Sequence, residues 1–142
     1  MHKAINMLKD KNILLCVCGS IAAYKICEII RTLRKLEANV QVMMTKSAEK
    51  FVGKTTFAAL SNQPVLTNLF PDTPKAGLEH IELSFELDLI VVAPSTANII
   101  AKLANGYAND LASTALIAAN KKILIVPAMN VKMWNNSINL IN

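Results

Sequence analysis

The sequence predicts one α/β domain built as a three-layer, doubly wound parallel sheet. Short, nearly continuous apolar runs end at glycine or proline, which is typical of strands covered on both faces. Segments with apolar residues at helical spacing lie between these runs. A strand, a helix and a second strand also follow one another within about 30 residues, which is the pattern of a right-handed βαβ unit.

The first predicted strand covers residues 12–18 (NILLCVC) and ends at Gly19. Ser20 is a good N-cap for the helix that follows. This helix is amphipathic, because apolar side chains recur at positions 22, 26, 29, 30, 33 and 36 and charged side chains fill the opposite face. A second strand is predicted at residues 39–45.

Proline, glycine and capping residues mark the remaining elements. The clearest central strand covers residues 87–93 and is expected to close at Pro94. The other predicted elements are short helices at 47–52 and 54–60, a short strand at 64–69, a loop at 71–77, a helix capped by Ser95 or Thr96 that runs to about residue 104, a helix capped by Asn109 or Asp110 that runs to about residue 119, and a strand at 122–126 stopped by Pro127.

Composition narrows the classes of function. The chain has 142 residues, 53% of them apolar, and its net charge of +5 is spread without a dense basic run. Aromatic residues make up only 5%, so a base-stacking surface for nucleic acid is not expected. No apolar run approaches the roughly 20 residues of a membrane span, and the N-terminus lacks the apolar centre of a signal peptide. We therefore expect a cytoplasmic protein with a small anionic ligand and neither a nucleic-acid nor a membrane partner.

The cysteines indicate neither a disulfide nor a metal site. Cys16 and Cys18 lie on one face of a predicted strand about 6.5–7 Å apart, a spacing that would strain a disulfide. Cys27 lies on the following helix. The sequence has two histidines and no Cys-x-x-Cys pattern, so no bound metal is expected.

A ligand site is expected beyond the carboxyl ends of the strands, where a parallel sheet turns into helix N-termini. Gly19 permits a tight turn, and Ser20 with the following amides can hold an anion at the positive end of a helix. The other loops that reach this edge are residues 45–47, 94–98 and 127–130. The glycines do not follow G-x-G-x-x-G, and the second strand ends in Met44-Thr45-Lys46 without an acidic residue for an adenosine ribose. A mononucleotide therefore fits better than a dinucleotide.

Four strings in this sequence carry a family resemblance: GSIAAYK at 19–25, APSTAN at 93–98, GYANDL at 106–111 and PAMNxxMW at 127–134. In their order and spacing they are similar to the flavoprotein part of the phosphopantothenoylcysteine decarboxylases, within the wider family of homo-oligomeric flavin-containing cysteine decarboxylases. PAMNxxMW is the most specific string and GSIAA the least. The resemblance implies a Rossmann-like flavoprotein fold, FMN as the cofactor, and a homo-oligomer that is a trimer or a trimer of trimers.

The resemblance also implies roles for individual positions. His80 matches the active-site histidine, as base or positioner, and Asn130 matches the asparagine that holds the substrate carboxylate, with Met129 and Met133 alongside. The positions implied at the cofactor are Gly19, Ser20, Ile21, Thr45, Ser47, Ser95, Thr96, Asn98 and Asp110, with the phosphate held by Ser95, Thr96 and Asn98. Plainer interpretations stay open: an ordinary loop histidine at position 80, an Asx-turn at position 130, and packing roles for Met129, Met133 and Trp134.

The activity implied by the resemblance is FMN-dependent decarboxylation of 4'-phosphopantothenoylcysteine to 4'-phosphopantetheine, a carbon–carbon lyase step in coenzyme A biosynthesis. Loss of CO2 needs an electron sink, and removing a hydride from the carbon that bears sulfur supplies one as a thioaldehyde. The decarboxylated ene-thiol then regains the hydride and a proton. In the family, a cysteine in a substrate clamp downstream of PAMNxxMW donates this proton. Because the sequence ends at Asn142, we expect a single FMN-binding domain over residues 1–142, without the clamp or a ligase domain, that does not finish this reduction.

Three other functions stay open. The chain could be a non-catalytic FMN-binding or regulatory subunit, or a fragment, of the same family. It could be a flavoprotein with another substrate, such as a peptide cysteine decarboxylase or a flavin prenyltransferase. It could also be a phosphate-binding α/β domain without flavin, in which case the purified protein would be colourless. His80 and Asn130 favour the enzyme, whereas the missing cysteine favours the binding subunit.

Overall fold

The computed structural model describes residues 7–69 and 86–142. At its centre is a four-stranded sheet in the order β2-β1-β3-β4, in which every neighbouring pair is parallel. The strands are β1 (Asn12–Val17), β2 (Asn39–Met44), β3 (Leu89–Ser95) and β4 (Ile123–Pro127). The order places β1 and β3 side by side at the centre, so the chain winds in opposite directions from them. The predicted doubly wound sheet is confirmed.

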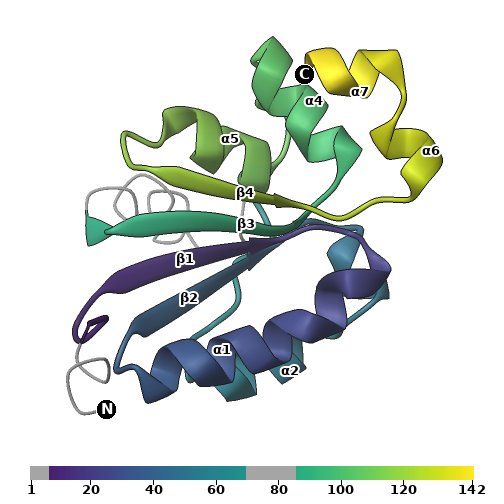
Figure 1. Cartoon of the computed structure of the whole chain (residues 1–142). Helices are drawn as coiled ribbons and strands as arrows, with labels where there is room; N and C mark the ends of the chain where they lie inside the picture. Colours follow the sequence, from purple (N-terminus) through teal and green to yellow (C-terminus); the bar gives the residue numbers. More distant parts are fainter. Residues whose placement is uncertain (1–6, 70–85) are drawn as a thin grey trace.

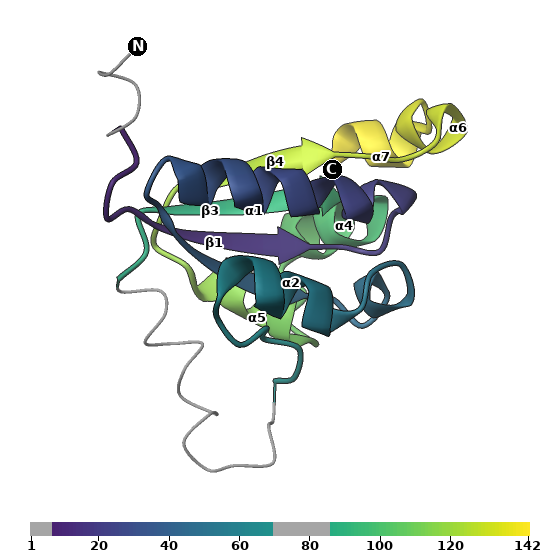
Figure 2. The ribbon, with the colours of Figure 1, turned by 90° about the horizontal axis from the view of Figure 1, so that it is seen from below.

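Helices cover both faces of this sheet and complete three layers (Figure 1). One face is covered by α1 (Ile26–Lys35) and α2 (Lys54–Ser61), and the other by α4 (Ala97–Asn105) and α5 (Leu111–Ala118). Figure 2 shows α6 and α7 beyond the carboxyl end of β4. The short elements are the 3-10 turns η1 (Ile21–Lys25) and η2 (Ala48–Lys50) and the helices α6 (Val131–Trp134) and α7 (Ser137–Ile141).

The alternation of β1 explains its nearly continuous apolar sequence. Leu15 and Val17 are fully buried in the cluster that includes Ile30 of α1 and Phe57 of α2. Cys16 is buried in the cluster on the opposite face, which includes residues of α4 and α5. Because successive side chains of a strand point to opposite faces, a strand between two helical layers must be apolar at every position.

The third strand extends further than the sequence indicated. Pro94 was expected to close it, but β3 continues to Ser95. Proline lacks an N–H group, yet the Pro94 carbonyl accepts the Cys18 N–H at 3.2 Å, and the Ser95 carbonyl accepts the Ala128 N–H at 3.0 Å. A register shift between Val92 and Ser95 accommodates this extension against β4. Ser95 is therefore a strand residue and not a helix cap.

The helix caps resolve the alternatives left by the sequence. Thr96 caps α4, because its Oγ1 accepts the Ile99 N–H at 3.4 Å. Asp110 caps α5, because its Oδ1 accepts the Ser113 N–H at 2.7 Å. Gly106 ends α4 with φ of 71°, a left-handed conformation that glycine adopts without strain.

Three further segments differ from the sequence-based expectation. Pro127, which was expected to stop the last strand, is the final residue of β4. The strand expected at 64–69 is reduced to one parallel bridge, between Leu66 and Met43 at the free side of β2. The weakly patterned segment after Trp134 contains the helix α7. The loop expected at 71–77 lies outside the described residues. Across the two described ranges, no helix is long and apolar enough to span a bilayer.

At the amino end of the sheet, the Asp88 carboxylate joins β3 to β1. It accepts the Asn12 backbone N–H at 2.8 Å and the Lys11 Nζ at 2.9 Å. The Asn12 N–H, and then the Lys11 ammonium, lower the pKa of Asp88 below its ordinary value of 3.8. A depressed folded-state pKa stabilises the fold above the ordinary value, and this contribution is lost as the pH falls through the folded value.

Replacing Asp88 by Asn should therefore lower stability at pH 6 and matter less at pH 3. Urea unfolding of both proteins at the two pH values measures the difference. Asp10→Asn is the matched control at the same end of the sheet, because Asn tolerates the left-handed φ of 59° found there. An Asp88→Asn deficit that is equally large at pH 3 would contradict this account.

Candidate functional site

The carboxyl ends of β1 and β2 meet at Gly19. The Thr45 N–H donates to the Val17 carbonyl at 3.0 Å, which carries the strand pairing into the loop after β2. A Cβ atom at Gly19 would lie 2.5 Å from the Cβ of Ser47. Only glycine allows the two corners to approach this closely, so Gly19, Thr45 and Ser47 form one corner of the site.

The turn after Gly19 is capped by Ser20. Ser20 is extended, with φ of −141°, and its side chain accepts the Ala22 N–H at 3.2 Å. The 3-10 turn η1 then leads directly into α1. Ile21 is 77% exposed at this turn, so its side chain is available for contact with a ligand or another chain.

A buried serine lies at the end of β3. Ser95 has no exposed surface, and its Oγ finds no hydrogen-bond partner among the described residues. Thr96 follows as the N-cap of α4, and Asn98 is exposed in the first turn. An unpartnered hydroxyl beside a helix N-terminus is suited to an anionic ligand, because burying it without a partner costs free energy.

The corner after β4 is linked to the others through the Ser95 carbonyl, which accepts the Ala128 N–H. Asn130 caps α6, with its Oδ1 accepting the Met133 N–H at 2.9 Å. The bond reaches the third residue on, so Asn130 is a helix N-cap and does not form the Asx-turn that the sequence left open. Met129 is half-buried, whereas Asn130 and Met133 are exposed.

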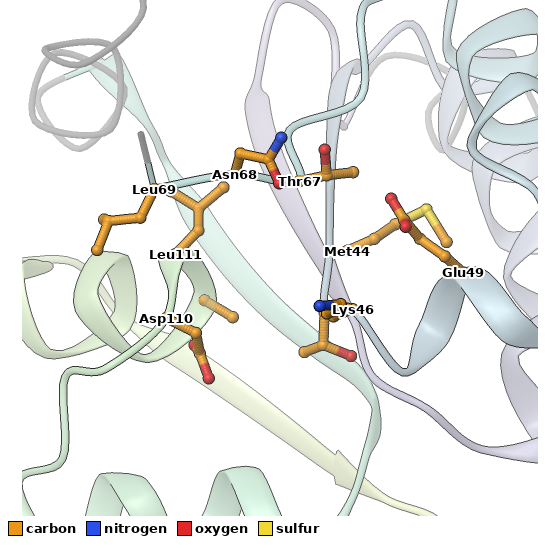
Figure 3. A pocket seen from close by; sticks show the side chains of 10 residues that line it. Met44, Lys46, Glu49, Thr67, Asn68, Leu69, Asp110 and Leu111 are labelled. Atoms are coloured by element: carbon orange, nitrogen blue, oxygen red, sulfur yellow. The ribbon is translucent and has the colours of Figure 1, made fainter. Parts of the chain in front are cut away.

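A cavity of about 280 Å³ opens beside the β1–β2 corner. Its lining comes from three segments. They are the end of β2 and the loop that follows (Met44, Thr45, Lys46 and Glu49), residues 67–69 (Thr67, Asn68 and Leu69), and the start of α5 (Asp110, Leu111 and Ala112). Figure 3 shows the β2 group and the α5 group facing each other, with residues 67–69 along a third side. This volume suits part of a cofactor or substrate, because pockets for complete ligands are usually larger.

Asp110 contributes a partly buried carboxyl group to the cavity lining. Burial raises the pKa of its carboxyl, but the Lys102 ammonium and the Ser113 N–H and hydroxyl outweigh burial and lower the pKa below its ordinary value. The carboxylate is therefore ionised at neutral pH. Because the Lys102 ammonium pairs with it, the α5 wall carries a compensated charge.

Two buried thiols lie beneath the Gly19 corner. A hydrogen bond from Cys16 to Cys18, together with burial, raises the pKa of the Cys16 thiol. The same bond lowers the pKa of Cys18, whose sulfur also accepts the Thr96 backbone N–H. Both cysteines are free thiols.

The structure brings most of the predicted residues to one edge of the sheet, but not into one contact group. Gly19 contacts Ser47, the Thr45 N–H bonds to the Val17 carbonyl, and further backbone bonds join this corner to Pro94 and join Ser95 to Ala128. Asp110 is instead part of the cavity wall that Thr45 faces. His80 lies outside the described residues.

Sequence reasoning missed several cavity residues. Lys46 lies between the predicted site residues Thr45 and Ser47, so its position in that loop could have identified it as a site residue. Thr67 and Asn68 reach the cavity because Leu66 pairs with Met43, which the sequence indicated only as a possible strand. Nothing in the sequence marked Lys102 as a site residue, because its partner Asp110 is the N-cap residue of the next helix.

The sheet is doubly wound and parallel, and its strand-to-helix loops gather at the carboxyl edge. This arrangement is that of the mononucleotide-type α/β domains. Within that class, the chain belongs to the Flavoprotein family, whose profile matches residues 2–142. The coenzyme A biosynthesis bifunctional protein CoaBC of Bacillus subtilis (strain 168) is 48% identical over 130 residues, which are 92% of this chain and 32% of that protein. The chain thus spans about a third of the length of the curated relatives it matches.

Solved structures agree with the family. The FMN-dependent cysteine decarboxylase SpaF matches with a TM-score of 0.85 and 28% identity, covering 96% of this chain and 77% of that one. A PPC decarboxylase mutant, C175S, complexed with pantothenoylaminoethenethiol, matches with a TM-score of 0.76 and 29% identity, covering 94% of this chain and 76% of that one. These two decarboxylases therefore share this fold and somewhat more than a quarter of the aligned residues.

Proposed function

We propose that this chain binds FMN at the carboxyl edge of its sheet and carries out the FMN-dependent decarboxylation of 4'-phosphopantothenoylcysteine, the step that leads to 4'-phosphopantetheine once the ene-thiol is reduced. The 48% identity to a coenzyme A biosynthesis protein supports the pathway, and the PPC decarboxylase structure with a pantothenoyl ligand supports the substrate class. The observation that carries the proposal is the buried Ser95 hydroxyl beside the N-terminus of α4, which has no hydrogen-bond partner within residues 7–69 and 86–142.

The residues present fit FMN. A side chain at position 19 would clash with Ser47, so glycine is needed for the turn after β1 to pack against the loop after β2 at the proposed site. The phosphate would be held at the α4 start by Ser95, Thr96 and Asn98, where the helix dipole and the orphaned hydroxyl favour a negative charge. The remaining residues proposed to hold the cofactor are Ser20, Ile21, Thr45, Ser47 and Asp110.

Bound FMN would supply the hydride acceptor and donor that this decarboxylation requires. The protein's part is to bind and orient the substrate. The Oδ1 atom of Asn130 is occupied by the Met133 N–H, which fixes the side-chain amide and leaves its Nδ2 to donate to the substrate carboxylate. Met129 and Met133 would flank this contact, and His80 would act as base or positioner during removal of the hydride.

We also propose a homo-oligomer, either a trimer or a trimer of trimers. Exposed apolar side chains near the proposed site support an interface with other chains. Leu124 of β4, Val131 and Trp134 of α6 are 51%, 72% and 51% exposed. Exposed apolar side chains of this size, grouped at one end of a domain, are typical of interfaces. We propose that the assembly works in the cytoplasm.

Purified protein, loaded with FMN, is assayed for CO2 release from 4'-phosphopantothenoylcysteine. We expect a yellow protein that releases CO2, and a loss of at least roughly tenfold in kcat/KM for Asn130→Ala, because one hydrogen bond to a charged group is removed. Asn136→Ala is the matched control, since Asn136 also caps a short helix. Bound FMN without CO2 release would identify a non-catalytic FMN-binding subunit, and a colourless protein would contradict the proposal entirely.

A second candidate substrate is a peptide that ends in cysteine. The structure of an EpiD mutant complexed with the substrate peptide DSYTC matches with a TM-score of 0.79 and 26% identity, against a TM-score of 0.76 for the PPC decarboxylase. The same assay with a C-terminal cysteine peptide separates the two classes. We expect the small phosphorylated acid to react and the peptide to remain unchanged.

A further inference from the structure

Lys102 is a lysine of α4 whose charged end is largely withdrawn from solvent. Its side chain is 18% exposed, compared with 52% for the lysine of the Lys11–Asp88 pair at the other end of the sheet. Its Nζ donates to Oδ2 of Asp110, the first residue before α5. A lysine is rarely withdrawn in this way unless its charge is paired, so this contact is the reason for its position.

The second oxygen of Asp110 is used by α5 itself. Oδ1 accepts the Ser113 N–H at 2.7 Å and the Ser113 hydroxyl at 2.8 Å, while the Asp110 N–H donates to Ser113 Oγ at 3.3 Å. Ser113 is fully buried. One carboxylate therefore joins the side of α4 to the first turn of α5, and moving Lys102 would release only the α4 half of this link.

The same first turn of α5 forms one wall of the 280 Å³ cavity. Asp110, Leu111 and Ala112 line it. Figure 3 shows Asp110 and Leu111 across the cavity from Met44 and Lys46. No other charged side chain of this wall lines the cavity among the described residues. The position of the wall relative to the β2 side thus depends on how Asp110 is held.

We propose that Lys102 is a positioning residue of the flavin site: through Asp110 it fixes the first turn of α5 as the cavity wall against which FMN binds. This inference rests on the proposed function, because it takes FMN as the ligand. An ion pair with a purely structural role would affect the stability of the fold without affecting the ligand. The two roles are separable by experiment.

The test is a double-mutant cycle with Lys102→Met and Asp110→Asn, read by titrating each apo protein with FMN. Asn still caps a helix, so Asp110→Asn removes the ion pair while keeping the cap. We expect Lys102→Met to weaken FMN binding roughly tenfold, the equivalent of one charge-assisted hydrogen bond. In the Asp110→Asn background the same change should have little further effect, because the partner is already absent.

Two further variants make the result specific. Lys102→Arg keeps the charge and should restore most of the affinity and the visible bands of bound FMN. Lys11→Met removes the matched ion pair at the opposite end of the sheet and should leave FMN binding unchanged. Additive losses in the cycle, unchanged affinity in Lys102→Met, or an equal loss in Lys11→Met would overturn the proposal.

A readout on the apo protein distinguishes failure of this inference from failure of the proposed function. Amide hydrogen exchange at residues 111–113 should be faster in Lys102→Met than in the wild type, with exchange in β1 unchanged. Wild-type protein that fails to bind FMN would contradict the proposed function, and FMN would then not be the ligand of this cavity. Normal FMN binding with unchanged exchange and affinity in Lys102→Met would sink only the role of Lys102.

Discussion

Replacing Gly19 by Ala should all but abolish FMN binding. The new Cβ would lie 2.5 Å from the Ser47 Cβ and 3.0 Å from the Ser47 carbonyl carbon, so the corner after β1 and the corner after β2 must separate. Overpacking of this kind costs about 1–3 kcal/mol of stability. Because the two corners form one side of the proposed site, we expect FMN affinity to fall roughly 100-fold.

Equilibrium FMN titration and urea unfolding of the same preparations measure both effects. Gly53→Ala is the matched control, because nothing lies within 4 Å of a Cβ at that position. Its effect on stability should stay within about 1 kcal/mol, and its FMN affinity should equal that of the wild type. A Gly19→Ala protein that binds FMN normally would mean that the ligand does not lie at this corner.

The second large effect is expected at Ser95, and it should appear in binding without appearing in stability. The Ser95 hydroxyl is buried and has no partner among the described residues, so the apo protein gains nothing from it. Ser95→Ala should change the free energy of unfolding of the apo protein by less than about 0.5 kcal/mol, or raise it. FMN affinity should fall roughly 10- to 100-fold if this hydroxyl bonds the charged phosphate.

Ser61 offers the reciprocal control. It is also buried, but its Oγ donates to the Gln63 carbonyl at 3.3 Å. Ser61→Ala should therefore destabilise the fold by about 1 kcal/mol while leaving FMN affinity unchanged. If Ser95→Ala behaves like Ser61→Ala, with lost stability and normal binding, then Ser95 has an ordinary structural role.

Local signals were enough to predict the sheet and most helix boundaries. The continuous apolar run of β1 is required by helices on both faces, and Gly106 ends α4 because a left-handed residue is needed there. The extension of β3 through Pro94 could not be predicted in this way. It depends on carbonyl acceptors supplied to Cys18 and Ala128, which only the assembled sheet brings into reach.

A residue of the candidate site could be predicted from the sequence only where its role depends on its own loop. Gly19 and Thr96 follow from strand ends and capping rules, because both properties belong to the local chain. The cavity wall does not, since Lys102 meets Asp110 across two helices and residues 67–69 reach the cavity through a single bridge. The identity of the ligand came from family motifs, which position and polarity alone do not supply.

The central claim is that FMN binds across the carboxyl-edge corners of β1, β2 and β3. Hydrogen exchange of the whole protein, followed by mass spectrometry with and without FMN, tests it directly. We expect added protection in peptides that contain residues 19–22, 45–48 and 95–99, and none around Asn12 and Asp88 at the amino edge. Protection confined to the amino edge, or no protection at saturating FMN, would contradict the account.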